Sequence, residues 1–208
     1  MCRKMNYNEI FNDINFHLLN DAHPSEYLDK ISRSEYFEQY PFNILLAQKH
    51  TKQWLKYHPE GVVWNHTMLV VDKAAELKFK SKDPEVFMWA SLLHDIGKPD
   101  TTKEHKGKIT SYNHEKIGEK LAEEFLLTLG CGEEFIKKVK SLIRWHMQIL
   151  FVVKNSQFAD IKEMIKQTDI NEIALLGFCD RMGRLNADYD DEKQNINIFL
   201  NKVNAIIQ

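Results

Sequence analysis

The chain has 208 residues, 43% of them hydrophobic, which suits one globular domain with or without an extension. Its formal net charge of −2 disfavours long duplex nucleic acid and anionic membranes as partners. The cysteines Cys2, Cys131 and Cys179 form no CxxC pair, so we expect no disulfide framework. With no signal-peptide pattern and no run of 18 apolar residues, the sequence predicts a cytoplasmic protein.

Helical spacing of apolar residues dominates the chain. It predicts helices over residues 7–20, 25–39, 41–57, 62–77, 84–96, 114–129, 133–147, 157–167, 171–185 and 193–207. The polar and β-branched stretch 100–113 predicts a short hairpin or an irregular lid. We therefore expect an all-α helical bundle, because neither βαβ alternation nor a Rossmann glycine pattern is present.

Local signals predict several helix ends. Asp83 followed by Pro84 is typical of a helix start. Gly97 is expected to end that helix as a C′ glycine, and Asn113 is expected to cap the next one.

Several titratable residues interrupt helical faces that should be apolar. They are His66, His94, Asp95, His146 and Asp180, and a further histidine, His114, lies at a predicted helix start. Each alone is consistent with a hydrogen-bonded core histidine or a paired carboxylate. A metal centre accounts for all six, because it needs neutral imidazoles and ionised carboxylates in a dry cavity.

The order of these residues is itself informative. The gaps between His66, His94-Asp95, His114, His146 and Asp180 are 28, 19, 32 and 34 residues, so each ligand can come from a different helix. This H…HD…D pattern resembles the HD superfamily of metal-dependent phosphohydrolases. The two further histidines match the subset whose six ligands hold two metals.

The resemblance can be narrowed to one branch. The segments "YHPEGVVWNHT", "LLHDIGKP", "NHEKIGEKLAEEF", "LIRWHM" and "CDRMGR" resemble the HD domain of bacterial CCA-adding enzymes (tRNA nucleotidyltransferases) over residues 57–186. No nucleotidyltransferase signature accompanies them, so we expect a stand-alone HD hydrolase. Residues 1–56 are then a helical extension packed on the core, 57–186 the HD core, and 187–208 a C-terminal helix of the same domain.

The resemblance also implies a reaction. His66, His94, Asp95 and Asp180 would hold one metal, and Asp95 would bridge to a second held by His114 and His146. Divalent Mn, Fe, Co, Ni or Zn suits these ligands, with Mg as a further candidate. The implied activity is hydrolysis of phosphomonoester or 2′,3′-cyclic phosphodiester bonds in a nucleotide-like substrate or RNA end. A metal-activated water is the implied nucleophile, with Asp95 catalytic.

Three cations are candidates for substrate binding. Lys98 can place its ammonium over the phosphate and is a catalytic candidate as well, although a solvated lysine at a helix end fits equally. Arg181 and Arg184 can grip a second phosphate or a base and sugar, although a solvated helix face fits as well. His58, in a turn, is assigned no role. Trp54 is expected in the core or the pocket wall.

Two other classes of function stay open. Some HD-fold proteins use the same six ligands to hold two irons and activate oxygen, so a di-iron oxygenase is the first alternative. The second is a non-catalytic module that binds nucleotide or RNA. The sequence leaves the oligomeric state undetermined.

Overall fold

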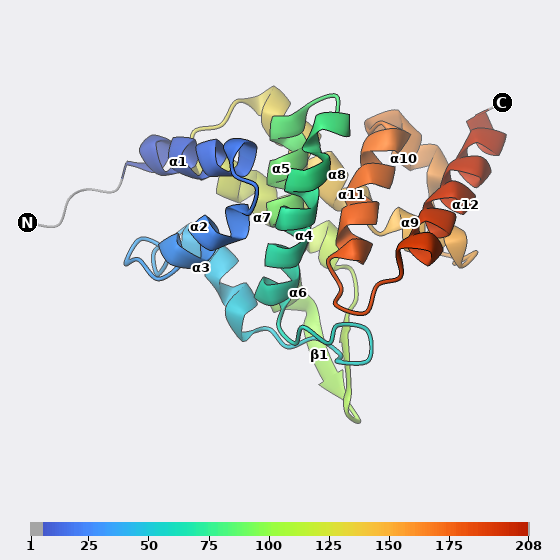
Figure 1. The fold of residues 1–208 in the computed structure, drawn as a ribbon, viewed down its shortest axis with the longest axis horizontal. Coiled ribbons are helices and arrows are strands. Elements are labelled where there is room, and N and C mark those ends of the chain that lie inside the picture. Colours follow the sequence, from blue (N-terminus) through green and yellow to red (C-terminus); the bar gives the residue numbers. More distant parts are fainter. Residues whose placement is uncertain (1–5, 208) are drawn as a thin grey trace, which may run out of the picture.

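The computed structural model describes residues 6–207, and it confirms an all-α fold with one small hairpin (Figure 1). In chain order the elements are α1 (Tyr7–Asn20), α2 (Pro24–Ile31), α3 (Phe42–Leu46), η1 (Ala47–His50), α4 (Val63–Leu77), η2 (Lys78–Lys80), α5 (Pro84–Leu93), α6 (Lys98–Thr101), β1 (Thr102–His105), β2 (Lys108–Ser111), α7 (His114–Thr128), α8 (Glu133–Trp145), α9 (Gln148–Val153), α10 (Ile161–Gln167), α11 (Ile170–Met182) and α12 (Tyr189–Ile207). No helix within this range is both long and apolar enough to cross a membrane.

Helix α5 lies at the centre of the bundle, with α1, α4, α8 and α11 packed around it (Figure 1). Every residue from Val86 to Leu93 is buried, which explains why this helix is apolar on all sides. The end of α5 therefore delivers the next residues, His94 and Asp95, directly into the core.

The N-terminal helices share this core. The amide of Asn15 on α1 donates to Glu85 Oε1 at 2.9 Å and accepts from Trp89 Nε1 at 2.9 Å, both on α5. Trp64 Nε1 on α4 donates to Asp29 Oδ1 on α2 at 2.6 Å. These polar contacts join α1 and α2 to the central helices.

The predicted 25–39 helix is wrong beyond Ile31. The hydroxyl of Ser32 donates to the Asp29 carbonyl at 2.8 Å, and that of Ser34 donates to the Ile31 carbonyl at 2.7 Å. Such side-chain bonds to the backbone compete with helical bonds, and the chain continues in turns to Pro41.

The predicted 41–57 helix is also wrong beyond His50. The hydroxyl of Thr51 donates to the Ala47 carbonyl at 2.9 Å, and the backbone then becomes extended. Lys52 pairs with Val62 in an isolated antiparallel bridge. This bridge pairs two extended residues, a contact that helical periodicity does not reveal.

The C-terminal boundaries differ from prediction in smaller ways. Helix α8 ends at Trp145, and α9 follows as a separate helix that the sequence did not predict. Helix α10 begins at Ile161 because the side chain of Gln148 holds the preceding chain, accepting from the Asp160 amide at 2.8 Å and donating to the Phe158 carbonyl at 3.2 Å.

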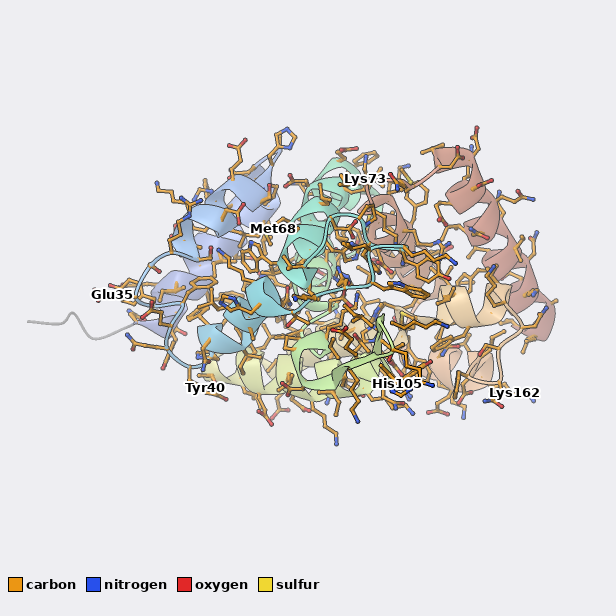
Figure 2. All side chains as sticks on the ribbon, turned by 90° about the horizontal axis from the view of Figure 1, so that it is seen from below. Glu35, Tyr40, Met68, Lys73, His105 and Lys162 are labelled. Carbon is orange, nitrogen blue, oxygen red and sulfur yellow. The ribbon has the colours of Figure 1, made fainter. Side chains whose placement is uncertain are left out.

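The hairpin predicted within 100–113 is confirmed. Strands β1 and β2 pair antiparallel from Thr102 with Ser111 to His105 with Lys108. The two turn residues, Lys106 and Gly107, both have positive φ, at 49° and 74°, as a tight hairpin turn requires. In Figure 2, seen from below, His105 of this hairpin lies between Tyr40 and Lys162 of α10.

Gly97 and Asn113 each border a helix, but the structure gives each a physical role different from the predicted one. Gly97 has φ −83° and is not a left-handed C′ glycine. Instead, a Cβ there would lie 2.2 Å from the His114 carbonyl oxygen and 2.5 Å from the Gly118 nitrogen, so glycine allows α6 to approach α7. Asn113 does precede α7, but its φ is 62° and its side chain makes no capping bond.

Candidate metal centre

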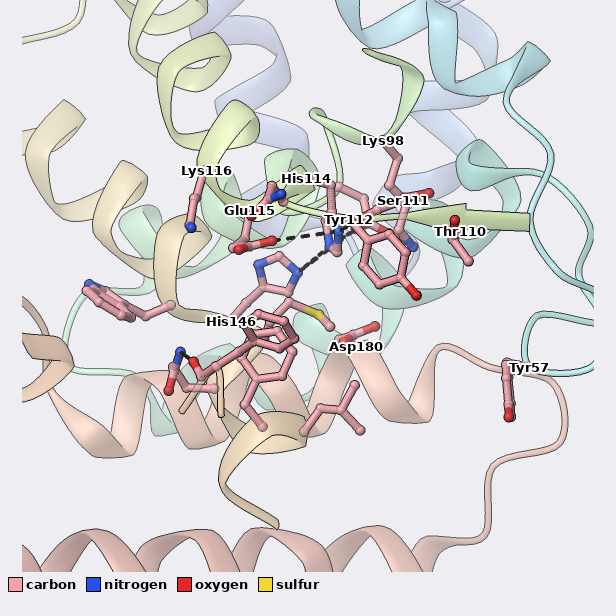
Figure 3. A pocket seen from close by; sticks show the side chains of 18 of the residues that line it. Tyr57, Lys98, Thr110, Ser111, Tyr112, His114, Glu115, Lys116, His146 and Asp180 are labelled. Atoms are coloured by element: carbon pink, nitrogen blue, oxygen red, sulfur yellow. Dashed lines mark hydrogen bonds and ion pairs between the residues drawn. The ribbon is translucent and has the colours of Figure 1, made fainter. Parts of the chain in front are cut away.

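The structure brings together all six residues predicted as metal ligands. Figure 3 shows three of them, His114, His146 and Asp180, at the cavity. They come from five helices or the residues immediately following them: His66 within α4, His94 and Asp95 after α5, His114 at the start of α7, His146 after α8, and Asp180 in the last turn of α11. Their exposure ranges from 0% to 8%, so the cluster is removed from bulk water.

Three of the histidines are oriented in the same way. In each, Nδ1–H donates to the backbone carbonyl three residues earlier, which leaves Nε2 free to point into the cluster. The bonds are His94 to Ser91 (2.9 Å), His114 to Ser111 (2.7 Å) and His146 to Ile143 (2.6 Å). Nε2 is therefore the nitrogen available to a metal in all three.

Asp95 lies between two pairs of imidazoles. Its Oδ2 is 3.3 Å from His94 Nε2 and 3.9 Å from His66 Nε2. Its Oδ1 is 3.4 Å from His114 Nε2 and 4.0 Å from His146 Nε2. Each carboxylate oxygen thus faces a different pair of nitrogens.

Asp180 belongs to one side of this arrangement, with Oδ1 2.9 Å from His66 Nε2 and 4.0 Å from His94 Nε2. We call His66, His94 and Asp180, with Asp95 Oδ2, the inner half. We call His114 and His146, with Asp95 Oδ1, the outer half. Both outer imidazoles line the adjoining cavity, whereas neither inner imidazole does.

The outer imidazoles are neutral. Burial lowers the pKa of His114 to about 3 and also lowers the pKa of His146. Burial acts to raise the pKa of Asp95, but the Lys98 ammonium and the His94 ring hold it well below its usual range. The outer half therefore offers neutral nitrogens and an ionised carboxylate, the protonation states that a metal requires.

The inner half carries more charge. Burial acts to lower the pKa of His66, but hydrogen bonds to Asp180 and Glu60 outweigh burial and raise it. Burial acts to raise the pKa of Asp180, yet the His66 hydrogen bond and the Arg184 charge keep it well below its usual range. In the absence of metal, a proton on His66 compensates the negative charge of the Asp180 and Glu60 carboxylates. A metal cation at the inner half would provide that positive charge instead.

The residues present fit divalent metal ions. His94 Nε2 is buried without a hydrogen-bond partner among residues 6–207. Buried atoms left in this state are costly unless another group satisfies them. Imidazole and carboxylate together suit Mn, Fe, Co, Ni and Zn, so both the geometry and the donor chemistry are those of a metal site.

Sequence reasoning missed Glu60 and assigned His58 no role. Glu60 is 9% exposed, and its Oε1 lies 3.0 Å from His66 Nδ1 while accepting from His58 Nδ1–H at 2.8 Å. A carboxylate behind a ligating histidine fixes the ring and raises its basicity. The available signal was the "HPEG" segment before α4, which reads as a simple turn.

Lys98 lies deep in the site rather than at a solvated helix end. It is 9% exposed, and its Nζ is 2.6 Å from Asp95 Oδ2 and donates to Gln53 Oε1 at 2.6 Å. Both predicted arginines line the cavity. Arg181 is held by Glu192 of α12, while Arg184 Nη2 lies 3.8 Å from Asp180 Oδ1.

A cavity of about 1210 Å³ opens over the outer half (Figure 3). Its lining includes Asp95, Lys98, His114, His146 and Asp180, and it extends over loop 53–58, strand β2 and the 154–160 connection. The cluster is thus buried from bulk water but accessible to a bound molecule.

The family model for the HD domain matches residues 63–171, just over half of the chain. The chain belongs to the HD domain family. The matched range holds His66, His94, Asp95, His114 and His146. Asp180 lies beyond it, and the tertiary structure places Asp180 beside His66.

The chain is also similar to parts of tRNA nucleotidyltransferases, as its motifs indicated. A "Multifunctional CCA protein" of Actinobacillus pleuropneumoniae is 38% identical over 69 residues, covering 33% of this chain and 16% of that protein. One of Neisseria meningitidis is 28% identical over 144 residues, covering 64% of this chain and 32% of that protein. The "A-adding tRNA nucleotidyltransferase" of Deinococcus radiodurans is 29% identical over 80 residues, covering 37% of this chain and 18% of that protein. The matched regions span at most about a third of these relatives.

Proposed function

We propose that this protein is a metal-dependent phosphohydrolase that cleaves phosphomonoester or 2′,3′-cyclic phosphodiester bonds in a nucleotide-like substrate. One observation carries the proposal: each oxygen of Asp95 faces its own pair of imidazole nitrogens, at 3.3–3.9 Å and 3.4–4.0 Å. Such an arrangement suits two divalent cations that share one carboxylate.

In this proposal the inner half holds one cation through His66, His94, Asp180 and Asp95 Oδ2. The outer half holds the second through His114, His146 and Asp95 Oδ1. When bound, two such ions lower the pKa of water and neutralise charge on a phosphoryl group. The Deinococcus radiodurans relative supports a nucleotide-like substrate, since its name describes a nucleotidyltransferase of tRNA.

The cationic side chains of the cavity bind and orient the phosphate. Lys98 lies against Asp95, so its ammonium meets a phosphate that approaches the shared carboxylate. Arg184 contacts Asp180 only at 3.8 Å, which leaves its N–H groups free to donate to phosphate oxygens. Arg181 is the weaker candidate, because Glu192 already engages its guanidinium.

The apolar wall around the cluster contributes by excluding water. Trp89, Leu92, Leu93 and Ile96 are fully buried on and just after α5. A dry surrounding strengthens the attraction between the charged groups and the phosphate.

The proposal is tested by removing metal with a chelator and restoring Mn, Fe, Co, Ni, Zn or Mg separately. Substrates are a chromogenic phosphate ester, nucleoside monophosphates and 2′,3′-cyclic nucleotides. We expect metal-dependent turnover by the native chain and none by Asp95→Asn. Equal turnover by both would refute the proposal, and mixed-valence iron signals without phosphate release would indicate an oxygenase instead.

A further inference from the structure

Loop 51–63, between η1 and α4, has a fixed shape. The Gln53 amide donates to the Gly61 carbonyl at 2.9 Å, and the Val63 amide donates to the Thr51 carbonyl at 2.9 Å. Backbone pairing at both ends closes the segment into a compact loop, a kind that often carries function.

The two faces of this loop differ in character. On the inner face, Gln53 and Glu60 are 5% and 9% exposed and contact the metal centre and Lys98. On the outer face, Trp54 is half-buried, and Lys56 and Tyr57 are exposed. The loop that braces the centre therefore also presents two aromatic rings at its rim.

The outer residues converge in space. The rings of Trp54 and Tyr57 are perpendicular with centroids 5.0 Å apart. Lys56 Nζ lies 5.6 Å from the Trp54 centroid and 5.4 Å from that of Tyr57, and Lys108 Nζ of β2 lies 6.0 Å from the Trp54 centroid. Neither ammonium forms an ion pair with a carboxylate of residues 6–207.

Aromatic rings beside free ammonium groups are the combination that binds single-stranded nucleic acid. Bases stack on the rings, and phosphates meet the cations. A single exposed aromatic residue carries no such meaning. Here both rings line the same cavity as Asp95 and His114.

The size of the cavity supports a ligand longer than one nucleotide. Its volume of about 1210 Å³ exceeds that of ordinary small-ligand sites, which run from about 300 to 1,000 Å³. Trp54 directly follows Gln53, whose side chain contacts Lys98, so the aromatic rim begins next to the reaction centre.

We propose that Trp54, Tyr57, Lys56 and Lys108 form a base-stacking subsite. It binds nucleotides adjacent to a phosphorylated end of single-stranded nucleic acid while that end lies at the metal centre. The inference rests on the proposed function for the chemistry at the end, but binding by the subsite can be measured without turnover.

Binding is measured by fluorescence anisotropy with the metal-loaded chain and a labelled pentaribonucleotide ending in a 3′-hydroxyl, which carries no terminal phosphate to release. We expect Tyr57→Ala and Trp54→Ala each to weaken binding by roughly 5- to 100-fold. Tyr57 is 51% exposed, so its variant tests the subsite even if Trp54→Ala folds poorly. Lys56→Ala and Lys108→Ala should each reduce the salt dependence of binding.

Phe79→Ala is the matched control. Phe79 is 75% exposed with Lys80 Nζ 5.8 Å from its ring, and it does not line the cavity. Its variant should bind like the native chain. The inference is wrong if Tyr57→Ala and Trp54→Ala also bind like the native chain, or if a blunt duplex binds as tightly as the single strand.

A hydrolysis assay shows whether the subsite or the proposed function fails. The native chain should prefer a 3′-phosphorylated pentanucleotide to a mononucleotide in kcat/KM, and Tyr57→Ala should reduce that preference. Subsite-dependent binding without hydrolysis under any metal would refute the proposed function and leave the subsite standing. Hydrolysis with no preference for length would refute the subsite alone.

Discussion

The inner and outer halves of the cluster share Asp95 but differ in their surroundings. In the inner half, His66 is fully buried and faces the carboxylate of Asp180 on one side and that of Glu60 on the other. In the outer half, the Nε2 atoms of His114 and His146 face Asp95 Oδ1 and each other, and both rings line the cavity.

The difference suggests two roles: the inner half retains its ion, and the outer half brings its ion into contact with substrate. Carboxylates supply negative charge to the inner half, and the pKa of His66 is raised accordingly. The outer imidazoles are neutral, with the pKa of His114 lowered by burial to about 3. We therefore expect the inner half to hold its ion more tightly and the outer half to present its ion to the phosphate.

The largest effect should come from removing the residue that both halves share. Asp95→Ala deletes a ligand of each ion and leaves Lys98 without its buried partner. Both ions should be lost and turnover should fall on the order of a thousandfold or more. Metal analysis and phosphate release measure this, with the exposed Asp100→Ala as control. Retention of both ions would contradict the shared-ligand arrangement.

Changing one half at a time tests the comparison directly. His146→Gln should abolish binding of the more weakly held ion and leave the tighter one in place. His66→Gln should instead lower the affinity for the more tightly held ion. Competition with a chromogenic chelator resolves the two affinities. If His146→Gln removed the tighter ion, the assignment of the halves would have to be reversed.

Glu60→Gln should have an intermediate effect confined to the inner half. Loss of the carboxylate behind His66 is expected to lower affinity for the tighter ion about 10- to 100-fold. Glu76→Gln, on the exposed face of α4 where Glu76 pairs with Lys73, is the matched control. Calorimetric titration of the metal-free variants makes the measurement. Equal losses in both variants would show that Glu60 does not position His66.

The smallest effect concerns the stability of the metal-free chain in acid. Burial lowers the pKa of His58 from 6.5 to about 4, against the opposing hydrogen bond of Glu60, and lowers that of His114 from 6.5 to about 3. Between the folded and unfolded values the unfolded chain binds more protons. The free energy of unfolding is therefore highest above pH 6.5 and falls as the pH decreases toward 4.

We expect each of these two imidazoles to lower the free energy of unfolding by about 2 kcal/mol between pH 7 and pH 5, measured by urea unfolding in the presence of chelator. His114→Gln should reduce this decrease, whereas His105→Gln, at an exposed position of the hairpin, should leave it unchanged. If His114→Gln left the decrease unchanged, His114 would not be the neutral outer imidazole assigned to it, whatever His66 with its raised pKa contributes.

Prediction from sequence worked where the signal was local. Helices α4, α7 and α8 lie within about two residues of their predicted bounds, because one face of each repeats its apolar residues at helical spacing. Five of the six titratable residues were found because they interrupt such faces, and His114 was found at a predicted helix start. The predicted helices 25–39 and 41–57 were wrong beyond Ile31 and His50, where the hydroxyls of Ser32 and Thr51 donate to backbone carbonyls.

The sequence by itself determined the helical class, the family and the residues of the cluster, since periodicity and ordered motifs are properties of the chain alone. Only the tertiary structure decided that Asp95 divides its oxygens between two pairs of imidazoles, that Glu60 supports His66, and that Trp54 reaches the cavity. These relations depend on the folding back of loop 51–63 and on the close approach of α6 to α7 at Gly97. These contacts depend on how the loop and the helices pack against one another, and the periodicity of apolar residues does not encode that packing.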